Sequence, residues 1–193
     1  MSYFVLTNPV GAANTLADFE PNDGFTGTFR SGAIIKDAPP NPIELIWNKE
    51  NETGVRVHYY SAAPVVLMTK LLVEALLASG VDNMDIYPVV IKSPSGKEDC
   101  LDYVAVNIVG AIAAADMDES EYEGEDEDEF FDGMFDVSFD SIVIDQEKAK
   151  GALMFRLAES VSAVIIHESV MNALNNNPED FQLTLPKTED HYT

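Results

Sequence analysis

The side chains that could carry out catalysis or bind a metal are few and far apart in this sequence. Its three histidines, His58, His167 and His191, are not grouped with cysteines or carboxylates at a spacing typical of metal ligands. The glycine-based signatures of nucleotide-binding loops and of serine hydrolases are missing. We therefore expect a protein that is not an enzyme and that has no cofactor and no metal. An enzyme of unrecognised type stays open as a third interpretation.

The single cysteine, Cys100, has acidic residues on both sides, Glu98 and Asp99 before it and Asp102 after it. Because nearby negative charge disfavours the thiolate, we expect Cys100 to be unreactive. A lone thiol cannot bridge its own chain, which favours a reducing compartment. The first residues do not resemble a signal peptide, and no apolar stretch is long enough for a membrane helix. We expect a cytoplasmic protein.

Carboxylates are concentrated in one part of the chain. The formal net charge is -23, and residues 98–147 contain eighteen Asp or Glu and no Lys or Arg. A negative field of this kind repels nucleic acids and anionic membranes and speeds encounter with basic proteins. The charge distribution therefore predicts a basic protein partner, and neither a nucleic acid nor a membrane.

The densest acidic stretch, residues 116–132, holds eleven acids among seventeen residues, so self-repulsion predicts a mobile acidic loop. Its contiguous acids differ from the alternating ligands of a calcium-binding loop. The phenylalanines at its end either fold back onto the domain and anchor the loop, or form a docking surface together with the acids. In such a surface the acids attract the partner and the rings are desolvated when it binds. The second interpretation assigns partner binding to Glu125, Asp126, Glu127, Asp128, Glu129, Phe130 and Phe131.

The elements that must position these residues indicate an α+β fold with a mixed or antiparallel sheet, a few packed helices and a long acidic loop. Hydrophobic periodicity and turn residues predict an edge strand at 2–7, a hairpin of 43–47 with 55–59 and a helix at 64–79. Further expected elements are strands at 86–92, 101–109, 141–145, 153–157, 163–167 and 181–185, and a helix at 168–176. We expect one domain over residues 1–193, with strands and loops in 1–60 and the main core in 61–193.

Two residues within the apolar strands, Trp47 and Arg156, could be structural or could contact a partner. Trp47 is expected in the core, since a large aromatic on the apolar face of a strand is more often buried than used as an interface anchor. Arg156 lies inside an apolar run, so it must be paired or reach solvent. We expect a structural ion pair for Arg156, with a place in a partner interface as the alternative.

Several apolar segments occur in a characteristic order, at 69–80, 86–91, 103–110, 151–157 and 165–170. In this order the last two-thirds of the chain resembles an immunity-protein family of bacterial polymorphic-toxin systems. The resemblance implies a protein that protects a toxin-producing cell by binding the toxin domain encoded beside it. It implies no catalytic residues. The residues that match the family as expected determinants of the fold are Tyr103, Asn107, Phe155 and Arg156.

The first functional hypothesis is thus an immunity protein that binds and neutralises a cognate bacterial toxin, with its acidic surface steering a basic partner. The alternative is a nucleic-acid mimic or acidic chaperone that binds basic proteins in general, because dense carboxylates can imitate phosphates. The two hypotheses differ in the breadth of binding, since the first requires a single cognate partner.

Overall fold

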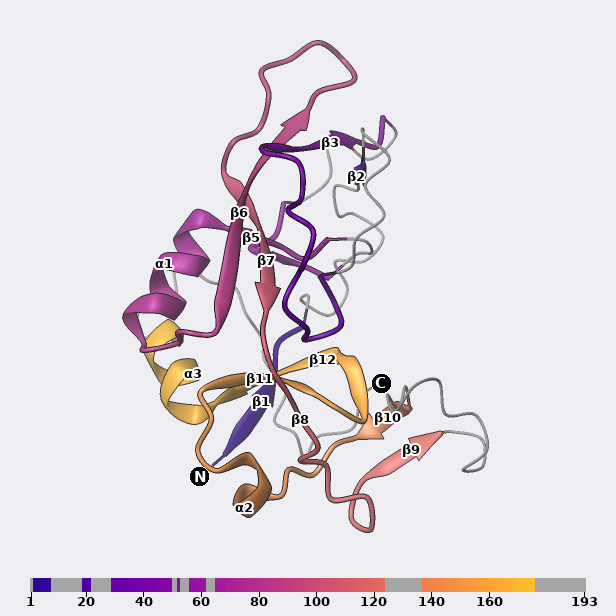
Figure 1. Ribbon diagram of the computed structural model, residues 1–193, viewed down its shortest axis with the longest axis vertical. Coiled ribbons are helices and arrows are strands. Elements are labelled where there is room, and N and C mark those ends of the chain that lie inside the picture. Colours follow the sequence, from indigo (N-terminus) through magenta and orange to yellow (C-terminus); the bar gives the residue numbers. More distant parts are fainter. Residues whose placement is uncertain are drawn as a thin grey trace.

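The computed structural model describes residues 2–7, 19–21, 29–49, 52, 56–61, 65–123 and 137–175. Within them, a six-stranded sheet, a four-stranded sheet, a two-stranded ribbon and the helices α1, α2 and α3 form an α+β fold, which confirms the expected fold class. The two larger sheets lie at opposite ends of the long axis, and the chain crosses between them from β7 to β8 (Figure 1).

The six-stranded sheet has the β6–β7 hairpin at its centre. Its strands, in spatial order, are β2 (Phe19–Pro21), β3 (Ile43–Trp47), β6 (Met84–Lys92), β7 (Tyr103–Ile108), β5 (Leu67–Thr69) and β4 (Tyr59–Tyr60). All residues of β7 are buried, which confirms the expected central strand. The side-chain amide of Asn107 in this strand donates to the Ala33 carbonyl at 2.9 Å, so the buried polar group has a partner.

The predicted hairpin between 43–47 and 55–59 is wrong. Strand β3 pairs in parallel with β6, where Ile43 lies beside Val89 and Leu45 beside Ile91. Strand β4 pairs with β5 at the other edge of the sheet. A parallel pair joins segments that are distant in sequence, so no local turn signal indicates it.

Helix α1 (Lys70–Ala78) begins later than the predicted helix at 64–79. Residues 65–68 are fully buried, and β5 pairs with β7 there. An uninterrupted apolar run fits a buried strand as well as a helix, which is why the pattern gave the wrong start. Thr69 caps the helix by accepting a bond from the Leu72 amide at 3.3 Å, and Gly80 ends it at φ 95°.

The four-stranded sheet brings the two ends of the described chain together. Its order is β1 (Tyr3–Val5), β12 (Ser160–His167), β11 (Met154–Leu157) and β8 (Ala111–Ile112). The edge position of β1 confirms the first predicted strand, and β11, β12 and α3 (Glu168–Asn175) match their predicted segments. The short helix α2 (Gln146–Ala149) precedes β11.

Among the described residues, two hydrophobic clusters form the core, one centred on the six-stranded sheet and one on the four-stranded sheet. Trp47 is buried in the first, as expected. In the second, the rings of Tyr3 and Phe155 meet edge to face with centroids 5.9 Å apart. The residues that match the family pattern, Tyr103, Asn107, Phe155 and Arg156, are all buried, which fits their expected role in the fold.

Arg156 lies fully buried, and among the described residues it forms no ion pair, contrary to prediction. Its Nη1 donates to the Val161 carbonyl and its Nη2 to the Phe29 carbonyl, each at 2.7 Å. Burial lowers the pKa of the guanidinium. Carbonyl oxygens solvate the cation without the further cost of desolvating a carboxylate.

None of the described helices is long and apolar enough to cross a membrane. The predicted strand at 181–185 and the C-terminal tail lie outside the described residues.

Candidate functional site

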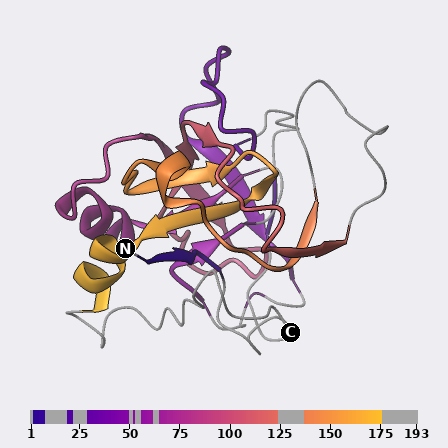
Figure 2. The ribbon, with the colours of Figure 1, turned by 90° about the horizontal axis from the view of Figure 1, so that it is seen from below.

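The residues predicted to bind a partner, Glu125, Asp126, Glu127, Asp128, Glu129, Phe130 and Phe131, lie outside the described residues. The segments on either side of them, 114–123 and 137–145, are described. We call these two segments the acidic ribbon. It lies on the side of the molecule away from α1 and α3 (Figures 1 and 2).

The acidic ribbon contains two antiparallel strands, β9 (Glu121–Glu123) and β10 (Ser138–Ser141). Glu123 lies opposite Ser138 and Tyr122 opposite Phe139, and the register shifts before Ser141. The rings of Tyr122 and Phe139 pack with centroids 5.8 Å apart. Phe139 also packs against the second core cluster, so the strand pair is attached to the body of the protein by an apolar contact.

A hydrogen-bonded turn precedes β9, so the prediction of a mobile loop over 116–132 is wrong for residues 116–123. The Asp116 carboxylate accepts bonds from the amides of Asp118 and Glu119 at 3.2 and 3.3 Å. The Ser120 hydroxyl accepts from the Val143 amide at 2.9 Å. Short polar side chains satisfy the backbone of the turn locally, and this offsets the repulsion among its acids. The rest of the predicted loop, 124–132, is not described.

Glu159, in the turn between β11 and β12, connects the acidic ribbon to the four-stranded sheet. Its Oε1 accepts a bond from the Ala115 amide at 3.2 Å, and its backbone carbonyl accepts from the Val137 amide at 3.1 Å. Both segments of the ribbon are thus held by one residue. Glu159 is buried, and this burial raises the pKa of its carboxyl, an effect that the Ala115 bond and the charge of Lys148 partly oppose.

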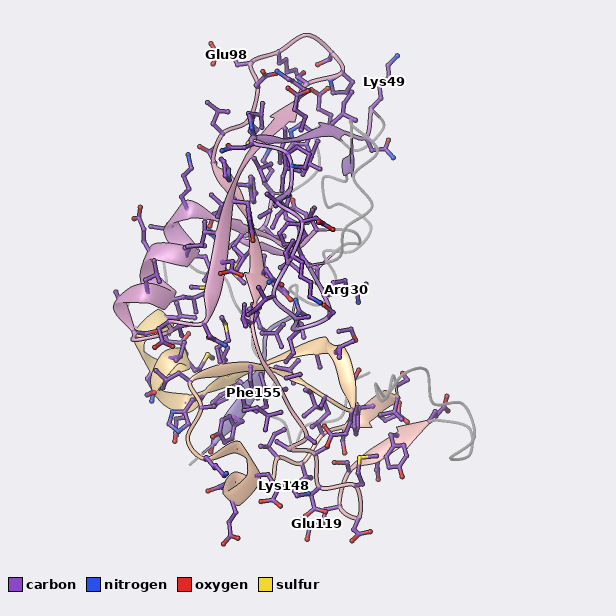
Figure 3. All side chains as sticks on the ribbon, in the orientation of Figure 1. Arg30, Lys49, Glu98, Glu119, Lys148 and Phe155 are labelled. Atoms are coloured by element: carbon purple, nitrogen blue, oxygen red, sulfur yellow. The ribbon has the colours of Figure 1, made fainter. Side chains whose placement is uncertain are left out.

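The exposed carboxylates in the described part of the ribbon include those of Asp118, Glu119, Glu123 and Asp140. Lys148 and Lys150 follow the ribbon in sequence, and Lys148 Nζ lies 3.5 Å from the Asp145 carboxylate. Glu119 and Lys148 lie at one end of the long axis and Glu98 at the other (Figure 3). The acids that flank Cys100 are therefore spatially separate from those of the ribbon.

A pocket of about 490 Å³ lies beside the acidic ribbon, and we call it the hydroxyl pocket. Strands β1, β10 and β12 and the end of β4 contribute its lining. Its apolar side chains include those of Val5, Leu6, Val137, Phe139 and Ile142, and its hydroxyl groups those of Tyr59, Ser61, Ser138, Ser160 and Ser162. The Ser160 and Ser162 hydroxyls lie 3.2 Å apart.

The lining of the hydroxyl pocket contains no carboxylate, imidazole, thiol, amine or guanidinium among the described residues. A serine nucleophile needs an adjacent base, and no such base lines the pocket. Burial raises the pKa of the Tyr59 phenol, so this group stays protonated at neutral pH. The pocket can donate and accept hydrogen bonds and can cover apolar groups, which are the requirements of binding.

The cysteine and the described histidines, which are residue types that can react or bind metals, are buried or hydrogen-bonded within the fold. Cys100 is buried. His58 and His167 each form a hydrogen bond of 2.8 Å to a hydroxyl, of Thr69 and of Ser169 respectively. In the described part of the chain, no group of His, Cys, Asp and Glu could hold a metal ion. His191 lies outside that part.

Sequence reasoning missed the hydroxyl pocket because its residues come from four separate segments. A partial signal was present in β12, where Ser160 and Ser162 alternate just before the apolar residues 163–166. Successive side chains of a strand point to opposite faces, so Ser160 and Ser162 share one face of β12. Two hydroxyls on one face of a strand that continues into the core indicated a polar cavity there.

The model of the immunity protein family Imm11 matches residues 13–184 of the chain. The match starts well before the segments that carried the resemblance, so the similarity extends beyond the last two-thirds of the chain. No curated protein matches the chain at a significant level.

Proposed function

The chain belongs to the Imm11 immunity protein family, and from this premise we propose that it neutralises a cognate toxin by binding it, without chemistry of its own. The family match carries the proposal, because immunity against a toxin is the function for which the family is named. The neutral lining of the hydroxyl pocket supports a role in binding, since a binding inhibitor needs affinity and no catalytic group.

We place the contact with the toxin on the acidic ribbon and propose that the toxin surface is basic. The exposed carboxylates of Asp118, Glu119, Glu123 and Asp140 give this side of the protein a negative field. Such a field raises the association rate with a basic partner more than it raises the final affinity. Residues 125–131, which continue the ribbon in sequence, belong to the same proposed contact.

Co-expression with the toxin domain encoded next to this chain tests the proposal. Cells that carry both genes should survive, and the two proteins should purify together. Continued toxicity, with no complex recovered, would contradict the proposal. Recovery of many unrelated basic proteins that are all released by moderate salt would instead support a nucleic-acid mimic.

A further inference from the structure

We propose that the hydroxyl pocket is a socket for one arginine side chain of the partner protein. The proposal rests on the proposed function, because it assigns a particular contact to the toxin. It adds a site and the chemistry of its occupant, which the family match does not provide.

The walls of the pocket suit the long stem of an arginine. Apolar side chains from β1 and β10, such as those of Val5 and Phe139, line the pocket. An arginine buries its methylene groups along apolar surface while its charged end stays close to water. The volume of about 490 Å³ is sufficient for one long side chain with part of its backbone.

The hydroxyl groups of the lining suit a group rich in N–H donors. A guanidinium has five N–H donors and no acceptor, whereas each serine or tyrosine hydroxyl has lone pairs that can accept. Ser138 lies on β10, near the exposed acids, and Ser160 and Ser162 lie on β12, so hydroxyls of the lining come from two strands. Acceptors on two strands match the planar, forked guanidinium of an arginine better than the single ammonium group of a lysine.

Charges around the pocket determine where the cationic end rests. Glu123 lies directly opposite Ser138 in the ribbon, and Asp140 follows Phe139, so carboxylates flank the β10 wall. Elsewhere in the lining, Tyr59 experiences the positive charge of buried Arg156. A second cation is therefore repelled from the Tyr59 side and attracted to the ribbon side. The stem fills the interior, and the guanidinium lies at the β10 wall.

Titration of the full chain with N-acetyl-arginine methylamide tests the chemistry of the pocket directly. We expect saturable amide shifts at Ser61, Ser138, Ser160 and Ser162, with Kd in the millimolar range of about 1–10 mM that is typical of a single small contact. The norleucine analogue keeps the stem without the charge, and the glutamate analogue reverses the charge. Equal shifts with norleucine, or larger shifts with glutamate, would overturn the arginine assignment.

Substitutions that fill the pocket test its use by the toxin. Ser162→Trp places a large ring inside, and Ser138→Trp blocks the exposed edge with less risk to folding. We expect each variant to weaken binding of the neighbouring toxin domain by about tenfold or more, the effect of losing one central anchor. Ser95→Trp, in the exposed β6–β7 loop, is the matched control and should bind normally.

The outcomes separate this proposal from the proposed function. If folded Ser138→Trp and Ser162→Trp proteins bind the toxin as tightly as wild type, the socket is refuted and toxin binding stands. If wild-type protein does not bind the toxin, both are refuted. If Ser95→Trp weakens binding as much as the pocket variants, the effect is not specific to the pocket, and the socket is again refuted.

Discussion

Removing four charges from the acidic ribbon should slow association with the toxin without much effect on dissociation. The change is Asp118→Asn, Glu119→Gln, Glu123→Gln and Asp140→Asn in one protein. All four side chains are exposed, so the substitutions leave the core contacts intact. The expected loss lies in the association rate because exposed charges act mainly while the partners approach each other.

The size of the effect follows from Coulomb's law. One partner cation about 10 Å from each carboxylate gains about 0.4 kcal/mol per pair in water, or about 1.7 kcal/mol for the four. Screening at 0.01 M salt leaves about 1.2 kcal/mol, and screening at 0.15 M leaves about 0.5 kcal/mol. At about 1.4 kcal/mol per factor of ten, association should slow about sevenfold at low salt and about twofold at 0.15 M.

Stopped-flow association with the toxin domain at several salt concentrations measures this effect. The matched control neutralises Glu74, Asp82, Glu98 and Asp102, which are exposed and lie outside the ribbon. Both variants change the net charge equally, so only the position of the charges differs. Equal slowing in both proteins would refute steering by the ribbon and leave the effect to net charge alone.

Two further predictions concern buried charged groups. Burial raises the pKa of the Glu159 carboxyl, so the native state binds the carboxyl proton more tightly than the unfolded state does. The protonated carboxyl therefore contributes to stability at low pH. That contribution is lost as the pH rises from the ordinary value of 4.5 through the raised pKa. The unfolding free energy of Glu159→Gln relative to wild type should therefore increase between pH 4.5 and 7; a pH-independent difference in urea titrations would contradict this account. Arg156→Lys keeps the charge but cannot reach the Val161 and Phe29 carbonyls in the same forked geometry, so we expect a loss of about 1.5–3 kcal/mol, the value of one charge-assisted bond. An unchanged urea midpoint and slope would show that the fork does not stabilise the fold.

The sequence predicted the elements whose signals are local. Strand β7 is apolar at every position except Asn107, α3 begins where the β-branched residues of β12 stop, and Trp47 lies among alternating apolar residues. Each of these predictions depends on periodicity within one segment. The start of α1 was wrong because residues 65–68 are apolar at every position, and such a run fits a helix and a buried strand equally well.

The errors and omissions arose where distant segments meet. The parallel pairing of β3 with β6 has no turn that could indicate it. Composition predicted repulsion at 116–123, but a turn capped by Asp116 and the contact of Tyr122 with Phe139 give this part its structure. The partner of Arg156 was predicted as a carboxylate, whereas carbonyls from two separate segments hold it. The hydroxyl pocket exists only once four segments have assembled.

Titration of toxin activity with increasing amounts of this protein tests the central claim most directly. Neutralisation by binding predicts that activity falls in proportion to the added protein and disappears at a fixed molar ratio, within the time of mixing, while both chains stay covalently unchanged. Inhibition by much less than that ratio, or inhibition that grows with incubation time and leaves a modified toxin, would contradict the claim and identify the protein as an enzyme.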